Sequence, residues 1–376
     1  MKIVVASDSY KGCMTSEKAN QAIARGILKV DPSICVETFL CGDGGEGTME
    51  AFVSACGGCV ETVCVHDAYR RMISASYGLI ENEETAIIEV SKVIGLYMVK
   101  KENRACMYAS SYGVGELLKH ALERGCIKII LALGGSSTND GGMGLLEAIG
   151  VRFYDKDQNC IEAMPANLHK IARIDTQDIL DFSNVQCIAA CDVKNYLLGE
   201  KGATYVFGKQ KGLYLNQQKK VEKAMCHYVQ KMQEIGYDLN AYEGGGAAGG
   251  IGAVYMAVLH ATMKPGVELL FSYNNIEKAI AESDLVITGE GQSDVQTLYG
   301  KLPIGVLTLA NKYNTPCICI SGALGVEYNR LYEAGFTGIF SVADRVMDFK
   351  TALALGEEKL EACAYSVVKT ICCFYK

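Results

Sequence analysis

Apolar runs that stop at clusters of glycine and acidic residues are the feature that most constrains the fold of this chain. Five such clusters occur, at 7–12 (SDSYKG), 42–48 (GDGGEGT), 134–142 (GGSSTNDGG), 190–193 (ACDV) and 289–294 (GEGQSD). Glycine lets successive backbone N–H groups face an anion, and a following helix adds its positive N-terminus. Carboxylates in the same loops would repel a bare phosphate but suit one carried with Mg²⁺. Because the chain has only five histidines, the combination predicts phosphoryl transfer.

The order of strand and helix patterns predicts an α/β protein. Apolar runs at 3–7 and 36–40 are each followed by a helical pattern, and the same β-α alternation returns from 284 with three further strands. Short runs that are apolar throughout are typical of parallel strands buried on both faces. The five strands predict a doubly wound parallel sheet, Rossmann- or flavodoxin-like, in a discontinuous domain formed by residues 1–60 and 280–376.

The middle of the chain, 61–279, is expected to be an inserted mixed α/β domain. Short strands between 60 and 90 are joined by a few residues each, which favours an antiparallel meander. A buried strand at 127–133 then leads into the 134–142 cluster. Because ligands bind at the carboxyl ends of parallel strands, we expect the active site in the cleft between the two domains.

Composition excludes several classes of protein. A formal net charge of −7 argues against nucleic-acid binding, and no apolar stretch is long enough to span a membrane. The first residues, MKIVVASDS, lack the pattern of a signal peptide, so we expect a cytoplasmic protein. The CGGC at 56–59 could be half of a zinc or redox motif or the end of a helix before a strand, and the 17 cysteines include no second CxxC.

Known nucleotide-binding motifs are absent or lack their context. GK occurs only at 208–209 and 300–301, without the rest of the Walker A pattern, and protein-kinase motifs are missing. The glycines of GGGAAGG at 244–250 match GxGxxG, but no strand precedes them. That segment is therefore either a phosphate-binding turn or a glycine-rich helix start packed on its neighbours, and a dehydrogenase is not favoured.

Three charged side chains in these loops are candidates for chemistry. Asp43 could reach a metal or a substrate hydroxyl. Lys11 could neutralise a carboxylate or a transferring phosphoryl group, or be an ordinary surface lysine. Asp192 follows an apolar strand and is a metal ligand, a general base or a cap for the next turn.

Taken together, the motifs resemble those of the type I bacterial glycerate kinase family. The clusters given above, GGGAAGG, VITGEGQSD at 286–294 and the GK-x-P at 300–303 occur in the family's order along the whole chain. The resemblance implies ATP- and Mg²⁺-dependent phosphorylation of D-glycerate by two α/β domains, one of them discontinuous. The bacterial family is associated with 2-phosphoglycerate as product. One departure is Gln292, where the family has an arginine, a role that Lys301 or Arg70–Arg71 could take over.

On this resemblance we hypothesise the following site. Asp192 or Asp43 is the base, with Lys11 as a catalytic cation. Substrate is bound by Ser9, Lys11, Gly44, Gly45, Glu46, Gly47 and Asp294. ATP is bound by Gly134, Gly135, Ser136, Ser137, Thr138, Asn139, Gly289, Gly291 and Lys301. Mg²⁺ is held by acids among Asp140, Asp192, Glu290 and Asp294.

Two alternatives stay open because of Gln292: a kinase for another small hydroxy acid, and a non-catalytic sensor of glycerate or nucleotide. A cysteine-based metal or redox protein is a third. The sequence does not indicate an oligomeric state.

Overall fold

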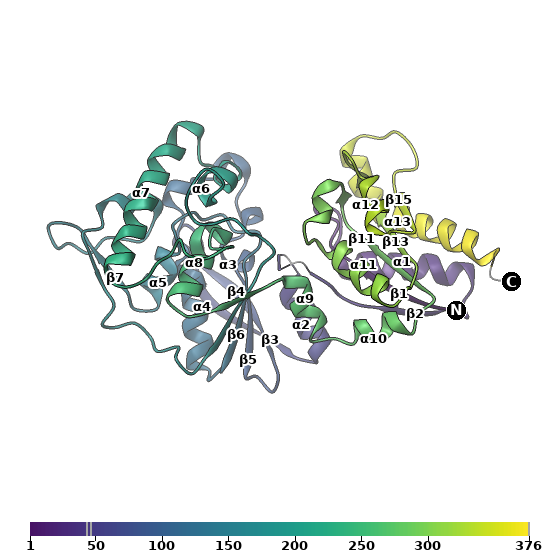
Figure 1. Cartoon of the computed structure of the whole chain (residues 1–376), viewed down its shortest axis with the longest axis horizontal. Helices are drawn as coiled ribbons and strands as arrows, with labels where there is room; N and C mark the ends of the chain where they lie inside the picture. Colours follow the sequence, from purple (N-terminus) through teal and green to yellow (C-terminus); the bar gives the residue numbers. More distant parts are fainter. Residues whose placement is uncertain (43, 46, 375–376) are drawn as a thin grey trace. The chain divides into compact units, whose positions relative to one another are not determined.

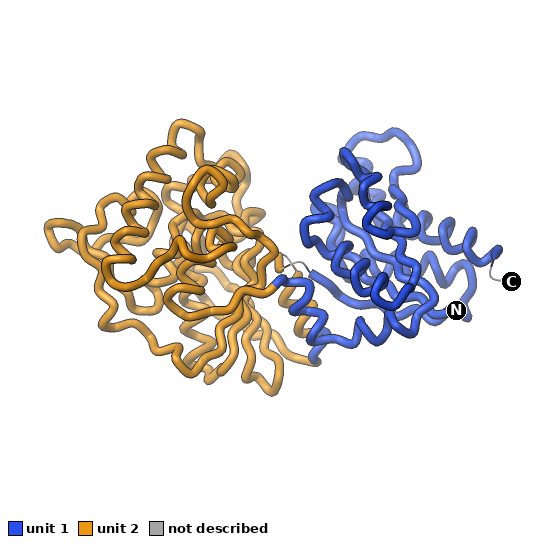
Figure 2. The backbone as a smooth tube through the Cα atoms, in the orientation of Figure 1, with its two compact units in different colours: residues 1–43, 54–56, 265–376 blue, residues 44–53, 57–264 orange. Residues whose placement is uncertain are grey.

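The computed structural model describes residues 1–42, 44–45 and 47–374, and it divides into two compact units (Figure 2). Unit 1 comprises residues 1–43, 54–56 and 265–376, and unit 2 comprises residues 44–53 and 57–264. Unit 1 is thus assembled from the two ends of the chain, drawn in purple and in green to yellow in Figure 1. The domain boundaries at 60 and 280 given above stay a prediction.

Unit 1 is built on a five-stranded, wholly parallel sheet, which confirms the expected α/β class. In spatial order its strands are β15 (Gly338–Ser341), β13 (Cys317–Ser321), β11 (Leu285–Gly289), β1 (Lys2–Ser7) and β2 (Cys35–Thr38). Ser7 pairs with Gly289, so β1 and β11 end at the same level and their following loops start side by side.

Both faces of the central strands of this sheet are buried. Ile3 and Ile287 pack with helices α1 and α13 in one cluster, while the alternate residues Val4 and Val286 are also fully buried and point to the opposite face. α1 starts after Thr15, whose hydroxyl accepts a hydrogen bond from Lys18 N at 3.3 Å and so caps the helix. The helices of unit 1 are α1 (Ser16–Val30), α9 (Gly266–Phe271), α10 (Ile276–Ala281), α11 (Leu302–Lys312), α12 (Arg330–Ala334) and α13 (Phe349–Cys372).

Unit 2 contains a six-stranded mixed sheet. In spatial order its strands are β10 (Thr262–Lys264), β9 (Gln186–Ala190), β6 (Lys128–Ala132), β5 (Thr85–Glu89), β4 (Met72–Ile80) and β3 (Cys59–His66). β3, β4 and β5 run antiparallel, as the short connections between 60 and 90 predicted, and the remaining neighbours are parallel. The short paired strands β7 (Arg152–Tyr154) and β8 (Arg173–Asp175) were not expected.

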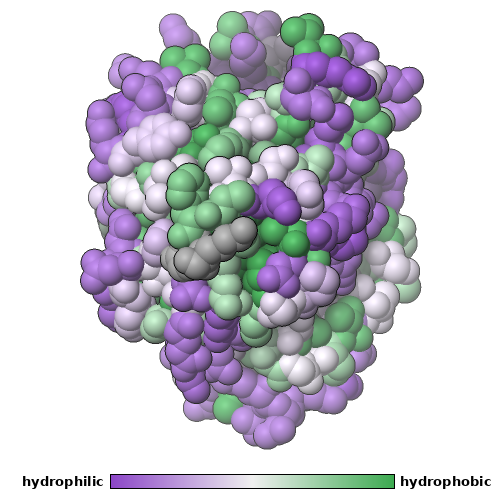
Figure 3. Space-filling model, turned by 90° about the vertical axis from the view of Figure 1, so that its right-hand side faces the viewer, coloured by the Kyte–Doolittle hydropathy of each residue, from purple (hydrophilic) through white to green (hydrophobic). Residues whose placement is uncertain are grey.

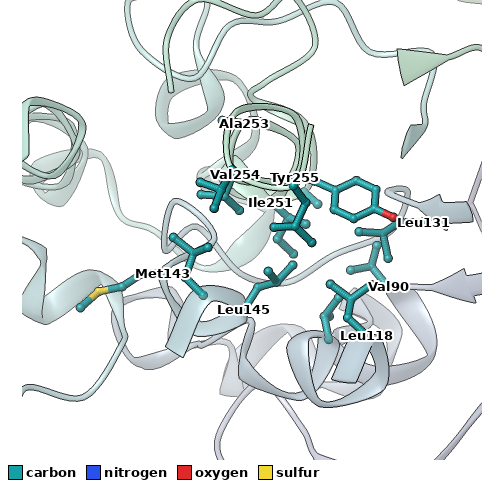
Figure 4. Packing of buried hydrophobic residues seen from close by; sticks show 14 of the residues in the cluster. Val90, Leu118, Leu131, Met143, Leu145, Ile251, Ala253, Val254 and Tyr255 are labelled. Carbon is teal, nitrogen blue, oxygen red and sulfur yellow. The ribbon is translucent and has the colours of Figure 1, made fainter. Parts of the chain in front are cut away.

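The core of unit 2 lies between this sheet and several helices (Figure 4). Figure 4 shows Tyr255 beside Leu131 and Val90, and the Tyr255 hydroxyl donates to Ile129 O at 3.0 Å. The buried phenol is therefore satisfied within the core. The helices are α2 (Thr48–Cys56, which crosses the division between the units), α3 (Ser91–Ile94), α4 (Tyr112–Glu123), α5 (Met143–Ala148), α6 (Ala203–Phe207), α7 (Leu215–Glu234) and α8 (Ile251–Ala257).

Shorter elements complete the chain. The two-residue strands β12 (Gln292–Ser293) and β14 (Ala323–Leu324) pair with each other in unit 1. The 3₁₀ turns are η1 (Leu96–Met98), η2 (Lys101–Asn103), η3 (Cys106–Tyr108), η4 (Pro165–Lys170), η5 (Lys209–Lys211), η6 (Ala247–Gly250) and η7 (Val295–Leu298).

Two ambiguous glycine segments have defined local structure. The CGGC at 56–59 is the end of α2 followed by the start of β3. The glycines at 244–250 open α8 through η6, and a side chain at Gly249 would collide with the carbonyl of Thr138. Here the interpretation as a glycine-rich helix start packed on its neighbours agrees with the structure.

Among the described residues, no helix combines the length and apolar character needed to cross a membrane. Hydrophobic and hydrophilic residues are interspersed on the face drawn in Figure 3.

Candidate active site

In unit 2, three parallel strands end at one edge of the sheet. Glu89 pairs with Ala132, and Ala132 pairs with Ala190, so β5, β6 and β9 stop at the same level. The segment after β6 begins the 134–142 loop, and the segment after β9 carries Asp192. Two predicted site regions are therefore neighbours at the carboxyl ends of these strands, where open α/β sheets bind ligands.

The N-terminal end of α2 joins this edge. Gly134 N donates to Gly44 O at 2.9 Å, and a side chain at Gly134 would lie 2.5 Å from Gly45 Cα. Glycine is thus required at 134 for the two backbones to approach. Gly47 forms the N-cap of α2, so the backbone N–H groups of the first turn point to the same region. The predicted Asp43 and Glu46 lie outside the described residues.

Only the start of the 134–142 loop is accessible. Gly134 is half-buried and Gly135 exposed, whereas every residue from Ser136 to Gly142 is buried. Ser137 uses both its N–H and its hydroxyl on Ile94 O, at 2.8 and 2.9 Å. Asn139 Nδ2 donates to Thr204 Oγ1 at 3.3 Å. Several donors that the sequence suggested for phosphate are therefore bonded within the protein.

Asp140 anchors the N-terminal end of α5. Its carboxylate is fully buried and accepts four hydrogen bonds, from the N–H and hydroxyl of Ser111 and from the N–H groups of Gly142 and Gly144, at 2.7–3.1 Å. Burial raises the pKa of this carboxyl group, and the four donors oppose that rise. With both oxygens occupied, its geometry is that of a structural acid, although its predicted role as a metal ligand is untested.

Asp192 stands two residues beyond the end of β9 and is half-buried. The preceding strand is fixed by its pairing with β6, and Leu133 N donates to Ala190 O at 3.2 Å. A Cβ at Gly44 would lie 3.0 Å from the same carbonyl oxygen. Asp192 is therefore carried by the strand end on which both the 134 loop and the segment before α2 converge.

A buried lysine that the sequence analysis missed supports the 134–142 loop. Lys211 is 3% exposed, and its Nζ donates to Ser136 Oγ at 3.0 Å and to Thr138 O at 2.7 Å. Desolvation lowers the pKa of Lys211 to about 8. It lies at the start of the charged, periodic run 210–236, which favours a solvent-facing helix, and nothing in the segment GKQKG distinguishes Lys211 from Lys209.

Glu89 is a second buried group that the sequence analysis did not single out. Its two carboxylate oxygens accept from Ser91 Oγ at 2.6 Å and from Met49 N in the first turn of α2 at 3.2 Å. Burial raises the pKa of Glu89. Glu89 joins the end of β5 to the start of α2. The feature of the sequence that could have identified it is its position as the last residue of an apolar strand.

In unit 1, the loops after β1 and β11 are bonded together. Asp8 N donates to Gly289 O at 2.8 Å, and Asp8 Oδ1 accepts from Ser9 N at 2.7 Å. A Cβ at Gly291 would lie 3.2 Å from Lys11 N. The predicted residues Ser9, Lys11, Gly289 and Gly291 therefore share one edge of this sheet.

Glu290 is the centre of a hydrogen-bond network in the same loop. Its Oε2 forms an ion pair with Lys301 Nζ at 2.9 Å, and its Oε1 accepts from Ser293 Oγ at 2.9 Å and from Thr297 Oγ1 at 2.6 Å. Asp294 caps η7 by accepting from Gln296 N at 2.8 Å. These contacts orient Lys301. Both carboxylate oxygens of Glu290 are bonded to protein donors, an arrangement that does not point to a metal site.

The cations considered as replacements for the family arginine differ in their surroundings. Gln292 Nε2 donates to Asp294 Oδ2 at 3.1 Å. Arg70 pairs with Glu147 and, at 3.5 Å, with Glu162, and Arg71 pairs with Asp67 at 2.6 Å. Lys301 lies in the same unit as Gln292, whereas the two arginines lie in unit 2 with acidic partners of their own.

Within residues 1–42, 44–45 and 47–374, no group of three or more His, Cys, Asp or Glu side chains is placed to hold a metal ion. Mg²⁺ usually keeps several waters and binds proteins through one or two carboxylates plus substrate phosphates. A single half-buried carboxylate such as that of Asp192 provides fewer ligands than a resident metal centre requires.

Comparison with known proteins gives a consistent result. Residues 3–372 match the glycerate kinase family. A glycerate kinase of Halalkalibacterium halodurans is 39% identical over 97% of both chains, and the glycerate 2-kinase of Escherichia coli K12 is 38% identical over 91% of this chain and 90% of its own.

The fold agrees with a solved structure. A protein from Salmonella typhimurium LT2, described as a glycerate kinase 2, superposes with a TM-score of 0.85 at 36% identity, covering 100% of this chain and 99% of its own. Sequence and fold thus agree over the full described length, and the chain belongs to the glycerate kinase family.

Proposed function

We propose that this kinase transfers the γ-phosphoryl group of Mg-ATP to the 2-hydroxyl of D-glycerate, giving 2-phosphoglycerate and ADP. The proposal is supported by the names of the relatives, one of which is a glycerate 2-kinase. The observation that carries it is the convergence of the α2 N-terminus, the Gly134–Ser136 turn and Asp192 at one sheet edge of unit 2. Helix N-termini and glycine turns bind anions, and an adjacent carboxylate suits a cation or a hydroxyl proton.

We assign the nucleotide phosphates to the accessible part of the 134–142 loop. Gly134 and Gly135 leave backbone accessible there, whereas the residues from Ser137 to Asp140 support the loop from inside. Mg²⁺ bound with ATP would neutralise charge on the β- and γ-phosphates, and Asp192 is the carboxylate best suited to hold it.

The acceptor hydroxyl must lose a proton as its oxygen bonds to phosphorus and the bond to the leaving ADP oxygen breaks. A carboxylate within hydrogen-bond reach accepts that proton. Asp192 and Asp43 are the two candidates, and a base and a metal ligand cannot be the same oxygen. Lys11 and Ser9 are proposed to bind the carboxylate of glycerate, and Lys301, oriented by Glu290, to neutralise a second anionic group.

The first experiment measures ADP release from Mg-ATP with D-glycerate, L-glycerate, glycolate, tartronate and lactate. We expect turnover with D-glycerate alone. Turnover confined to another acid would support the second candidate, a kinase for a different hydroxy acid, which Gln292 in place of the family arginine favours. ATP binding without turnover of any acid would make the protein a sensor.

Product regiochemistry is tested by ³¹P NMR of the reaction mixture. Phosphate on C2 couples to one carbon-bound proton and gives a doublet, whereas phosphate on C3 couples to two. A doublet supports 2-phosphoglycerate, and a triplet-like signal would overturn that part of the proposal.

A further inference from the structure

Lys211 is a buried cation that is hydrogen-bonded to neutral atoms. Its ammonium group donates to Ser136 Oγ and Thr138 O, and the buried Asp140 acts on it through space. Buried charges in proteins are normally paired, because removing a charge from water is costly. An ammonium group that is hydrogen-bonded to neutral atoms inside the 134–142 loop is therefore suited to an anion that binds against that loop.

The segment that carries Lys211 is held in place by several contacts. Lys209–Lys211 forms η5, and Arg104 donates from Nη1 to Gln210 O at 3.0 Å and from Nη2 to Leu96 O at 2.9 Å. Leu96 N in turn donates to Gly135 O at 2.8 Å. Arg104 thus ties the lysine segment and the glycine turn to the same stretch of backbone.

The contact to Ser136 also determines what that serine can do. Because Lys211 Nζ is a donor only, Ser136 Oγ is the acceptor, and the serine's own proton is left to donate elsewhere. Ser136 and Thr138 take two of the three N–H groups of the ammonium. A phosphate at Gly134 and Gly135 would meet the positive potential of this arrangement.

We propose that Lys211 is a positioning residue for the nucleotide, which fixes Ser136 and Thr138 and supplies the positive charge that the ATP phosphates require. The inference rests on the proposed function, since it takes ATP as the anion. The chain lacks a Walker A lysine. In this proposal Lys211, from a turn distant in sequence from the glycine loop, serves the same electrostatic purpose.

The test compares Lys211→Met with Lys209→Met by calorimetric titration of ATP, AMP and adenosine in the presence of Mg²⁺. Lys209 is exposed in the same 3₁₀ turn and serves as the matched control. We expect Lys211→Met to weaken ATP binding about 10- to 100-fold while adenosine binding changes less than about twofold, as for loss of a charge-assisted contact. Equal ATP affinity in Lys211→Met and wild type would overturn the inference, as would equal losses for ATP and adenosine.

A wild-type measurement keeps the inference testable if Lys211→Met does not fold. The groups facing the ammonium are Cys106, whose pKa is raised to about 11 by burial, and the buried Asp140. Cys106 is not expected to lose its proton between pH 7.5 and 9.5, whereas Lys211 loses its proton there. ATP affinity should therefore fall up to about tenfold per pH unit above pH 8, and a flat profile would overturn the inference. Failure of wild type to bind ATP at pH 7.5 would instead overturn the proposed function.

Discussion

At the end of β9, Asp192 combines half-burial with a fixed backbone, because β9 is paired on both sides. Whether it holds Mg²⁺ or accepts the hydroxyl proton, replacing the carboxylate by an amide removes the charge that either role needs. We expect Asp192→Asn to lower kcat by about 100-fold or more, measured by ADP release. Asp157→Asn, at an exposed turn of the same unit, is the control. Near-normal kcat in Asp192→Asn would exclude both roles.

Gln292 is the second single residue with a specific expectation. It is exposed, and its side-chain amide donates a hydrogen bond to Asp294. An arginine there could keep that contact and add a bidentate cation for a carboxylate or phosphate. We expect Gln292→Arg to lower the KM for the acid substrate or for ATP several-fold without changing Tm by more than a few degrees. If both KM values stay unchanged, this position does not contact either substrate.

At the scale of elements, the loop after β11 depends on one buried acid. Removing the Glu290 side chain would leave the hydroxyls of Ser293 and Thr297 without their acceptor and Lys301 without its partner. We expect Glu290→Ala to reduce the free energy of unfolding by about 1–3 kcal/mol, the cost of leaving buried donors unsatisfied. Urea unfolding measures this. Glu333→Ala, on the exposed surface of α12, should change stability by less than about 0.5 kcal/mol.

The start of α5 provides a comparable test in unit 2. In Asp140→Asn, an amide NH₂ would replace one oxygen and face at least one donor, Gly142 N in one orientation or those of Ser111 and Gly144 in the other. We expect a loss of stability, again about 1–3 kcal/mol, in the absence of any metal. If Asp140→Asn is as stable as wild type but loses Mg²⁺-dependent ATP binding, Asp140 is a metal ligand after all.

The elements also indicate what could be predicted from sequence. The five strands of unit 1 are short, mostly apolar runs, and burial on both faces requires that pattern, so their parallel sheet could be predicted. β7 and β8 have three residues each, too few for a periodic signal. Lys211 and the buried part of the 134–142 loop could not be predicted. A lysine in a glycine-flanked turn is normally solvated, whereas Lys211 is buried in the folded chain, where its ammonium group bonds to the distant 134–142 loop.

At the scale of the whole molecule, the many cysteines give stability a pH dependence. Burial raises the pKa of the Cys106, Cys319 and Cys363 thiols to about 11, and raises that of Cys41 further. In the unfolded chain these thiols lose their protons near pH 8.5–9, whereas in the folded protein they keep them. The folded state then binds more protons, so stability is full below about pH 8.5 and declines as pH rises toward 11.

We therefore expect the urea midpoint to fall steadily between pH 8.5 and 11 under reducing conditions. Lys211 opposes this trend, since its folded pKa of about 8 lies below that of an unfolded lysine, but it is one group against the four thiols named above and others, such as Cys317, whose pKa burial also raises. Cys106→Ala, Cys319→Ala and Cys363→Ala combined should flatten the slope. An unchanged slope in the triple variant would show that other groups, such as the buried Tyr10 and Tyr228, dominate it.

The assembly of unit 1 from both ends of the chain has a consequence for synthesis on the ribosome. β1 is among the first segments to emerge, yet its partner β11 lies 282 residues further along, as the pairing of Ile3 with Leu285 requires. While unit 2 is being translated, β1 can pair only with β2. The other edge of β1 stays unpaired until β11 has been synthesised. Exposed strand edges promote association with other chains. The nascent N-terminus is therefore expected to be prone to association until the last quarter of the chain, from Leu285 on, completes the sheet.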